Sequence, residues 1–573
     1  MFRLKRSVKL PDYVKKKIWL KYYPKDLPAK VEIPNKSLPQ VFEEAAKTHA
    51  EEVSVIFYGK EVRRKEIYEG SCRLATALHN MGIGKGDVVA LYLPNCINFI
   101  ISYQGILRSG AMATTINPLF VPREIAYQLQ DSGAETIITM DMFYNNVKQI
   151  KDETQLKNII LCNLKGEKLQ VDKEDLDKIL NYDELMDKTP PNPPNLEINP
   201  TQDIAVLQYT GGTTGLPKGV LLTHHNLIAN AYQVAAVGRA HLKAMNEDKV
   251  RSISVIPWYH IYGQSNELVL SACELVPKET THAFTQFDPA QILDAIQKYR
   301  PNVMAAVPTI LAMLLYHPKA NDTDFTSLKA LTMGSSSCPI ELLKKWEEVS
   351  GNPLSEGYGL TEASPAVLTR QAWIFGNVPG SVGVPIPSTL AGIVDPDTND
   401  FLPLGELGEL VVSGPQVMKG YWKRPEDTKN VFFKAGRRRW LKTGDLARMD
   451  EKGYFYIVDR TKDIIKYKGH SVYPREIEEV LYENEAVMDA AVIGVPDSMV
   501  GEQIKAFIVL KPGFKGKVKE YEILDWCKER MGGDKYPRSI ELRDSLPKSL
   551  IGKTLRKVLR EQEAKKARDT EVV

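Results

Sequence analysis

A glycine- and threonine-rich run, residues 209–219, has the composition of a loop that binds phosphate groups. Its glycines allow consecutive backbone N–H groups to turn towards one anion, its threonine hydroxyls add donors, and Lys218 adds a compact positive charge. The run is not a Walker A loop, because the Gly-Lys-Ser/Thr ending is absent and Pro217 precedes the lysine. A flexible linker is the alternative, but linkers rarely end in Leu-Pro-Lys-Gly before an apolar strand such as residues 220–222. The run therefore predicts a site for a polyphosphate.

A second motif, Ser-Glu-Gly-Tyr-Gly-Leu-Thr-Glu at residues 355–362, strengthens this prediction. Alone it could be a turn before a helix. Together with the phosphate loop it resembles the adenylate-forming superfamily, which contains acyl-CoA synthetases, luciferases and peptide-synthetase adenylation domains. There the loop holds the β- and γ-phosphates of ATP, the tyrosine covers adenine, the threonine reaches the α-phosphate and the glutamate holds Mg²⁺. The resemblance implies these roles for Tyr358, Thr361 and Glu362, and Mg²⁺ prefers carboxylate oxygen.

Further motifs extend the resemblance over nearly the whole chain. A Thr-Gly-Asp motif matches the superfamily's ribose-binding aspartate, here Asp445, which can accept hydrogen bonds from two hydroxyls. Residues 459–463 match the hinge, where Arg460 would contact the ribose and Lys462 would be the pivot. Residues 334–339 lie where the superfamily has a turn along the adenine, although they depart from its usual proline position.

The lysine expected to act in the first chemical step lies near the C-terminus. Residues 547–553 fit the superfamily pattern Pro-Lys-x-x-x-Gly-Lys, which identifies Lys553 as the adenylation lysine. Activation brings a carboxylate against an α-phosphate, and a mobile ammonium that reaches both anions offsets their repulsion. The resemblance also places Lys468 and Gly469 on the CoA path.

Residues 257–263 resemble the superfamily's aromatic-histidine segment. A lone histidine among aromatic residues is usually a core residue, but here the match indicates that His260 lies near the carboxylate and helps to open the pantetheine path. An apolar border would then surround the acyl chain. The expected border is Trp258, Tyr262, Gly263 and residues 268–270.

The candidate site residues therefore fall into several sets. The catalytic residues are Lys553, Thr361 and His260. The nucleotide-binding residues are Thr210, Gly211, Gly212, Thr213, Thr214, Gly215, Lys218, Gly334, Ser335, Glu356, Gly357, Tyr358, Thr361, Asp445, Arg460 and Lys553. The metal ligands are Glu362 and Thr210, the CoA path has Lys468 and Gly469, and the hinge is Lys462.

The elements that position these motifs have the pattern of an α/β protein. Between residues 38 and 181, β-like runs such as 88–93 alternate with helical stretches such as 66–81, which predicts βα units around a parallel sheet. More α/β pattern follows the phosphate loop. Short glycine-rich strands at residues 392–456 then predict a small β-barrel-like subdomain.

After the hinge the pattern changes to a compact α+β unit that is large enough to fold independently. The expected elements are helices at 475–484 and 520–530 and strands at 489–493, 503–509 and 539–542. We therefore expect an N-terminal AMP-binding (adenylation) domain, residues 1–461, and a small mobile C-terminal domain, residues 462–573. Residues 561–573 have the composition of a charged tail.

Bulk properties exclude several classes. The 573 residues exceed one domain, and a content of 43% hydrophobic and 26% charged residues is that of an ordinary globular enzyme. A net charge of +3 is too small to indicate nucleic acid as a partner. The six cysteines are scattered singly, which argues against a zinc site or a disulfide framework and favours a reducing cytoplasm. No apolar run is long enough for a transmembrane helix.

The N-terminus is basic and partly aromatic. Its basic and aromatic residues are Arg3, Lys5, Arg6, Lys9, Lys15, Lys16, Lys17, Trp19, Tyr22 and Tyr23. They predict either a surface helix that touches anionic lipid or a solvated leader packed on the N-terminal domain.

The chain departs from the superfamily upstream of the hinge. Three consecutive arginines, residues 437–439, stand where the superfamily commonly has an acidic-Gly pair. The sequence offers no reason for this replacement.

The resemblance implies an ATP-dependent acyl-CoA ligase with two half-reactions. A carboxylic acid and Mg-ATP would give acyl-AMP and pyrophosphate, and CoA would then attack to give acyl-CoA and AMP. Glu356 and the Ala-Ser-Pro after Glu362 are most like fatty-acid-CoA ligases, which predicts a medium- or long-chain fatty acid. The expected partners are this small carboxylic acid, ATP, CoA and Mg²⁺, and the expected form is a monomer or homodimer.

Three alternatives remain. One is an aryl- or short-chain acyl-CoA ligase, and another is an acyl-adenylating enzyme that loads a carrier protein. The third, an ATP-binding sensor without chemistry, is disfavoured because a sensor needs neither Glu362 nor Lys553.

Overall fold

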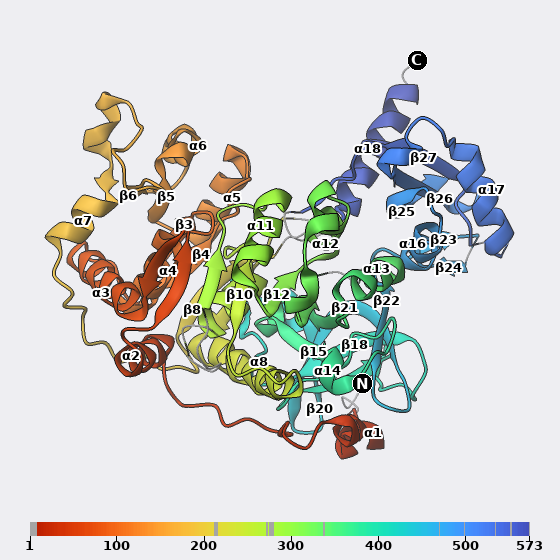
Figure 1. Ribbon diagram of the computed structural model, residues 1–573, viewed down its shortest axis with the longest axis horizontal. Helices are drawn as coiled ribbons and strands as arrows, with labels where there is room; N and C mark the ends of the chain where they lie inside the picture. Colours follow the sequence, from red (N-terminus) through yellow and green to blue (C-terminus); the bar gives the residue numbers. More distant parts are fainter. Residues whose placement is uncertain are drawn as a thin grey trace, which may run out of the picture.

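The computed structural model describes residues 8–210, 216–270, 273, 280–335, 338–468, 470–497, 499–532, 535–549 and 553–571. Within these residues the chain forms four β-sheets, of nine, eight, five and five strands. Figure 1 shows three of them in one large body and the fourth, in blue, set apart near the C-terminus. This arrangement is the mixed α/β fold, with a large N-terminal part and a small C-terminal part, that the sequence predicts.

The eight-stranded sheet contains the two strands, β8 and β9, that flank the expected phosphate loop. Its order is β19 (Gly420–Tyr421), β9 (Gly219–Thr223), β8 (Ile204–Tyr209), β4 (Met112–Thr115), β3 (Val88–Tyr92), β5 (Thr136–Met140), β6 (Asn158–Cys162) and β7 (Leu180–Asn181). The strands from β8 to β7 run parallel, whereas β9 and β19 are antiparallel to their neighbours. The five residues of β3 and the five of β5 are all buried, as the strands of a sheet covered on both faces usually are.

The nine-stranded sheet combines strands from residues 53–63 with strands from residues 251–385. Its order is β16 (Val384–Pro385), β15 (Ala366–Arg370), β14 (Ser355–Gly359), β13 (Ala330–Met333), β12 (Val303–Ala306), β10 (Arg251–Ser254), β11 (Thr280–Ala283), β1 (Val53–Phe57) and β2 (Lys60–Arg63). The first hairpin of the chain thus adds to this sheet, through parallel pairing of β1 with β11, and not to the sheet of β3.

Helices cover both sheets. The longer ones are α2 (Leu38–Thr48), α3 (Arg64–Asn80), α4 (Ile97–Arg108), α5 (Pro122–Ser132), α8 (His224–Ala244), α11 (Pro289–Tyr299) and α13 (Ile340–Ser350). The shorter ones are α6 (Tyr144–Ile150), α7 (Tyr182–Lys188), α9 (Ile261–Gly263), α12 (Pro308–Leu315), α14 (Ala372–Phe375) and α15 (Pro425–Val431). No described helix is both long and apolar enough to cross a membrane.

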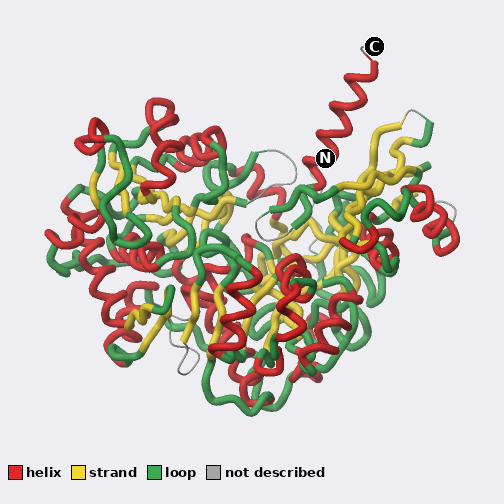
Figure 2. The backbone as a smooth tube through the Cα atoms, turned by 45° about the horizontal axis from the view of Figure 1, so that its top comes forward, coloured by secondary structure: helices red, strands yellow, loops and turns green. Residues whose placement is uncertain are grey.

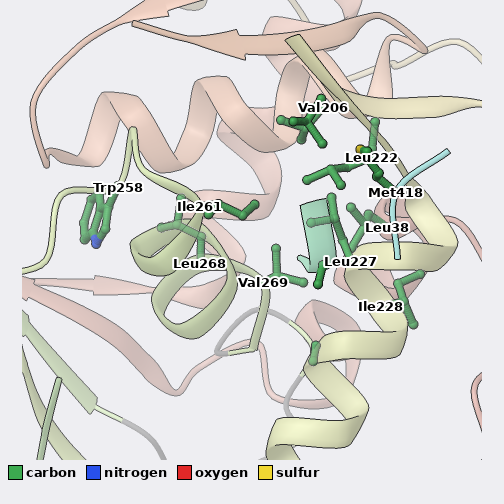
Figure 3. Close-up of a cluster of buried hydrophobic side chains, with 14 of the residues drawn as sticks. Leu38, Val206, Leu222, Leu227, Ile228, Trp258, Ile261, Leu268, Val269 and Met418 are labelled. Atoms are coloured by element: carbon green, nitrogen blue, oxygen red, sulfur yellow. The ribbon is translucent and has the colours of Figure 1, made fainter. Parts of the chain in front are cut away.

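Helix α8 begins at a capping box. The Thr223 hydroxyl accepts a hydrogen bond from the Asn226 N–H at 3.1 Å, and the Asn226 side chain accepts one from the Thr223 N–H at 3.0 Å. The helix then packs on β8 and β9. Its buried residues join a core gathered from distant segments, among them Leu38, Leu222, Trp258 and Met418 (Figure 3). Full burial of each such side chain contributes about 1.5–3 kcal/mol.

The third sheet is the expected glycine-rich subdomain. Its strands are β17 (Leu390–Val394), β18 (Gly408–Ser413), β21 (Arg438–Met449), β20 (Phe432–Ala435) and β22 (Phe455–Arg460). All pairs are antiparallel, and the long β21 pairs with β18, β20 and β22. The N-terminal segment packs on this sheet through α1 (Asp12–Lys16) and a 3₁₀ helix, η1 (Ile18–Tyr22), with Val14 and Trp19 each 1% exposed.

The C-terminal unit is an α+β sandwich. Its strands are β24 (His470–Val472), β23 (Ile465–Tyr467), β26 (Gly501–Leu510), β25 (Val487–Asp497) and β27 (Ser539–Arg543), and its helices are α16 (Pro474–Tyr482), α17 (Glu520–Arg530) and α18 (Arg556–Glu571). Residues 561–571, which the sequence presents as a charged tail, are helical, because α18 runs through them, and its last turns extend beyond the sheet (Figure 2). Charged partners hold this helix: Glu563 pairs with Lys505 at 2.6 Å, and Lys566 pairs with Glu541 at 2.8 Å.

Candidate active site

One cavity of about 1840 Å³ collects most of the candidate residues. The candidates that line it are Thr210, Lys218, His260, Gly334, Ser335, Gly357, Tyr358, Thr361, Glu362, Asp445, Arg460, Lys462 and Lys553. Glu356 and Lys468 are not among its lining residues. Gly211, Gly212, Thr213, Thr214, Gly215 and Gly469 lie outside the described residues.

The residues expected at adenine and ribose meet through strand pairing. Asp445 on β21 lies opposite Arg460 on β22, and the Arg460 Nε is 3.2 Å from the Asp445 carboxylate. The Tyr358 hydroxyl donates to the other Asp445 oxygen at 2.6 Å. Burial, together with the Asp445 charge, raises the pKa of Tyr358 well above its usual value, so the phenol stays a donor. Three motifs that are far apart in the sequence thereby form one hydrogen-bonded cluster.

Glu362 has a partner that the sequence did not reveal. The Tyr421 hydroxyl donates to Glu362 Oε1 at 2.8 Å, and Tyr421 also lines the cavity. Lys218 lies over the Tyr421 ring, 5.4 Å from its centroid, and pairs with Asp427 at 2.8 Å. No local pattern around residues 421–427 signals these roles, because they depend on β19 pairing with β9.

The two candidate metal ligands offer the kind of atom that a magnesium ion prefers. The Glu362 carboxylate and the Thr210 hydroxyl are both hard oxygen ligands, and both residues line the same cavity as Lys218. Mg²⁺ typically takes one or two such groups together with substrate phosphates.

Lys553 lies in the cavity and is hydrogen-bonded to Ser549. The Ser549 N–H donates to the Lys553 carbonyl at 2.8 Å, and the Lys553 N–H donates to the Ser549 hydroxyl at 3.2 Å. The neighbouring Lys548 contacts both parts of the protein, since it donates to the Thr309 hydroxyl at 3.1 Å and pairs with Asp489 at 2.6 Å. Burial and the nearby Arg460 charge lower the pKa of Lys553 to about 7.

His260 is neutral, and its ring carries one N–H group that can donate a hydrogen bond. Burial and the Lys553 charge lower the pKa of His260 to about 4. Its Nδ1 accepts a hydrogen bond from the Tyr262 N–H at 3.2 Å, so the neutral ring carries its proton on Nε2. An imidazole N–H beside a lysine suits the binding of a carboxylate.

The cavity continues into an apolar branch beside α8. The helix contributes Val234, Val237, Gly238 and Leu242, Met245 directly follows it, and the facing strands contribute Val303, Ala305 and Ala330. Of the expected border, Tyr262 and Leu270 line the cavity, whereas Trp258, Gly263, Leu268 and Val269 do not. Trp258 lies in the core instead and donates to the Ser254 hydroxyl at 2.9 Å. The sequence did not predict that α8 lines the cavity, because its apolar residues resemble those of any helix in a hydrophobic core.

Glu356 does not line the cavity but holds together the segments that carry the candidate adenine-binding residues. One carboxylate oxygen accepts from Arg370 at 2.6 Å, and the other accepts from the Cys338 N–H at 3.3 Å. Arg370 is fully buried on β15, in register with Glu356 on β14. Glu356 therefore ties β15 and the turn after β13 to the strand that carries Tyr358. A Cβ on Gly334, in the same turn, would lie 2.9 Å from the Tyr262 ring, so this close approach requires glycine.

Glu356→Gln is expected to lower the free energy of unfolding by about 1.5–3 kcal/mol, because a charge-assisted hydrogen bond to a buried guanidinium is lost. The KM for ATP should rise while the rate at saturating ATP changes little, since the residue acts through the turn. Urea unfolding and initial rates would measure both effects. The exposed Glu406→Gln variant is the control. A large fall in kcat with unchanged KM would contradict the positioning role.

The expected hinge segment is braced by α18. Asp463, directly after Lys462, pairs with Arg560 at 2.9 Å and with Arg556 at 3.6 Å. Arg556 also binds Glu478 of α16 at 2.7 Å. Although burial opposes it, this pair of arginines lowers the pKa of Asp463. Residues from Asp463 onwards are thus held to α18 as one unit.

Comparisons with known proteins agree with this geometry. The model of the AMP-binding enzyme family matches residues 42–422, and that of the AMP-binding enzyme C-terminal domain matches residues 476–553. Long-chain-fatty-acid–CoA ligases of Bacillus subtilis and Yersinia pestis are 39% and 36% identical, over 96% of this chain and 98% of each relative.

Among solved structures, ATP-bound MatB from Rhodopseudomonas palustris has a TM-score of 0.80 and 26% identity, over 92% of this chain and 99% of that one. The apo form of the same protein has a TM-score of 0.69 over 92% and 99% of the chains, also at 26% identity. The family matches cover the phosphate-loop, adenine and lysine motifs. The chain therefore belongs to the AMP-binding enzyme family, the adenylate-forming superfamily that its motifs resemble.

Proposed function

We propose that the protein is an ATP-dependent acyl-CoA ligase that activates a medium- or long-chain fatty acid through acyl-AMP and releases acyl-CoA, AMP and pyrophosphate. One observation carries the proposal: Lys553, His260 and the cluster around Asp445 line the same cavity, and this cavity continues into an apolar branch. The long-chain-fatty-acid–CoA ligases among its relatives support an aliphatic substrate.

In the first half-reaction the chain's own groups orient two anions against each other. Tyr358, Asp445 and Arg460 would hold the adenosine, and the Nε2–H of His260 would donate to a carboxylate oxygen of the acid. Glu362 and Thr210 would hold Mg²⁺, which neutralises charge on the phosphates when bound. The ammonium of Lys553 would stabilise the charge that develops between carboxylate and α-phosphate. No protein nucleophile is required.

In the second half-reaction the C-terminal domain, residues 462–573, would rotate about Lys462. This rotation would withdraw Lys553 and bring Lys468 and Gly469 to the CoA path. The position of Lys468 supports this sequence of events: it lies outside the cavity, where its N–H donates to the Val500 carbonyl at 2.8 Å.

The working form of the enzyme is proposed to be a cytoplasmic monomer or homodimer that uses Mg²⁺, ATP and CoA. A reducing compartment is supported by the cysteines, since all six are free and buried.

The acyl preference tests the proposal most directly. Each methylene that leaves water for the apolar branch is worth about 0.8 kcal/mol, so kcat/KM should rise roughly fourfold per added methylene until the branch is full. AMP release with CoA across acids from acetate to stearate, with aromatic acids included, would measure this. Acetate or 4-coumarate outrunning every acid of octanoate length or longer would favour the aryl- or short-chain alternative, and accumulation of acyl-AMP despite added CoA would favour carrier loading.

A matched pair of variants locates the branch. A Cβ at Gly238 would meet no atom within 4 Å, and Gly238 lines the cavity, so Gly238→Phe should fill the branch and move the optimum to shorter acids. Ala244→Phe, on the exposed side of the same helix, should leave the optimum unchanged.

Glu362→Gln tests the metal assignment. The variant should need at least about tenfold more Mg²⁺ for half-maximal turnover, because an anionic ligand becomes neutral while the Tyr421 hydrogen bond can persist. A magnesium titration at fixed ATP would show the shift. An unaltered titration curve would mean that the ion is held elsewhere.

A further inference from the structure

The apolar branch of the cavity ends among buried residues. Its lining includes Leu242 near the end of α8, Met245 directly after α8, Val250 directly before β10, and Ala330, the first residue of β13. These four residues form one hydrophobic cluster, and none of them is more than 7% exposed. The branch therefore ends inside the protein, at what we call the end cluster.

The strand direction places the end cluster far from the reacting groups. Ala330 begins β13, whereas the turn with Gly334 and Ser335, expected at the adenine, directly follows the end of this strand. A strand rises about 3.3 Å per residue, so the cluster lies about 13 Å from that turn. An acid whose carboxylate lies beside His260 and Lys553 would therefore have the distal end of its acyl chain at the end cluster.

One polar side chain interrupts this apolar end. His241 lies one helical turn before Met245, lines the cavity and is 4% exposed. Within the described part of the chain, its Nε2 has no hydrogen-bond partner. Buried polar groups in folded proteins are nearly always hydrogen-bonded, so an imidazole nitrogen left over in the wall of a cavity indicates a ligand that supplies the missing partner.

The charge state of His241 decides the kind of ligand. Burial lowers the pKa of His241 to about 4, so the ring is neutral at neutral pH. A neutral imidazole has one donor and one acceptor, and a hydroxyl group can serve either of them because it both donates and accepts. A carboxylate fits poorly, since its charge would enter an apolar cluster beside an uncharged ring.

We propose that His241 binds a hydroxyl group at the distal end of the acyl chain, so that the enzyme accepts ω-hydroxy fatty acids of matching length as well as unsubstituted ones. The inference rests on the proposed ligase function and adds a substrate class to it. An unsubstituted acid leaves the imidazole nitrogen without a partner, whereas an ω-hydroxy acid of matching length satisfies both the imidazole and its own hydroxyl.

A ratio of two kcat/KM values tests this subsite. Each acid from ω-hydroxydecanoate to ω-hydroxyhexadecanoate is compared with the unsubstituted acid of the same length, by AMP release with CoA. In a wholly apolar branch the buried hydroxyl would lower kcat/KM by about 10- to 100-fold at every length. We expect this penalty to shrink to about threefold or less at the length that brings the hydroxyl to His241, and to return in full for shorter acids.

Histidine variants locate the effect. His241→Leu should restore the full penalty at the matching length, and His241→Gln, which keeps a donor and an acceptor, should restore only part of it. His282→Leu is the control and should keep the ratios of the parent, because His282 is also buried, at 6% exposed, but is not among the residues that line the cavity. Both rates in a ratio come from one variant, so a partial loss of folded enzyme cancels.

Each other outcome overturns the inference. An unchanged ratio in His241→Leu would place the hydroxyl at another polar group of the cavity, such as Glu267. A dicarboxylic acid that outruns the ω-hydroxy acid of its length would show a site for an anion. Turnover of unsubstituted acids with the full penalty at every length would refute the subsite alone. Failure on every unsubstituted acid would refute the ligase assignment and the subsite with it.

Discussion

Lys553→Ala is expected to slow acyl-AMP formation by about 10²–10³-fold, the scale of losing one preorganised donor at a polar transition state. Thioester formation from supplied acyl-AMP should stay close to the parent rate, because the proposed rotation has by then withdrawn the lysine. Pyrophosphate exchange measures the first step and thiol consumption measures the second. Lys557→Ala, another lysine that lines the cavity, is the control. Equal losses in both half-reactions would refute the assignment.

The pH profile gives a second readout of the same residue. The pKa of Lys553 is lowered to about 7, so the free enzyme loses this ammonium as pH rises through 7. The kcat/KM of the adenylation step reports free-enzyme ionisations, and it should therefore fall on the alkaline side. Lys553→Arg keeps its charge at all working pH values, so whatever activity it retains should lack this alkaline limb.

Lys462→Pro is expected to leave adenylation largely intact and to reduce acyl-CoA formation by at least about 100-fold. Proline fixes φ near −65°, removes the backbone N–H and restricts the residue before it, so rotation at this position is blocked. The structure holds Lys553 in the cavity, which makes the adenylating orientation the one to be trapped. Lys462→Ala removes the side chain but keeps the rotation, so its CoA step should survive. A proline variant that makes acyl-CoA at the parent rate would place the pivot elsewhere.

The sequence predicted those helices and strands that are defined by residues close together in the chain. The helix expected at residues 520–530 matches α17, and the strand at 503–509 lies within β26, because periodicity and turn residues define both. The pairing of β1 with β11 was not predictable in this way, since it depends on a partner more than two hundred residues later. The helix at residues 561–571 was not predicted for a related reason. Its charges resemble those of a solvated tail, and the partners that hold it, Lys505 and Glu541, come from the distant strands β26 and β27.

In the candidate site, too, residues within a motif were predicted and residues placed by long-range strand pairing were not. Motif resemblance selected Tyr358, Asp445 and Arg460, and the structure brings them together. It could not select Tyr421 or Arg370, because their roles arise from strand register and not from their neighbours in the chain.

The brace between Asp463 and α18 has a consequence for the order in which the chain becomes functional. Domains fold in the order of their synthesis, and Arg556 and Arg560 follow the motifs up to Arg460 in the chain. The candidate nucleotide-binding motifs can therefore assemble on a nascent chain before the proposed adenylation lysine and the brace of the proposed pivot have been made. We expect a nascent chain stalled at residue 461 to bind ATP but to leave fatty acid untouched, so that ATP is spent only after α18 has been added.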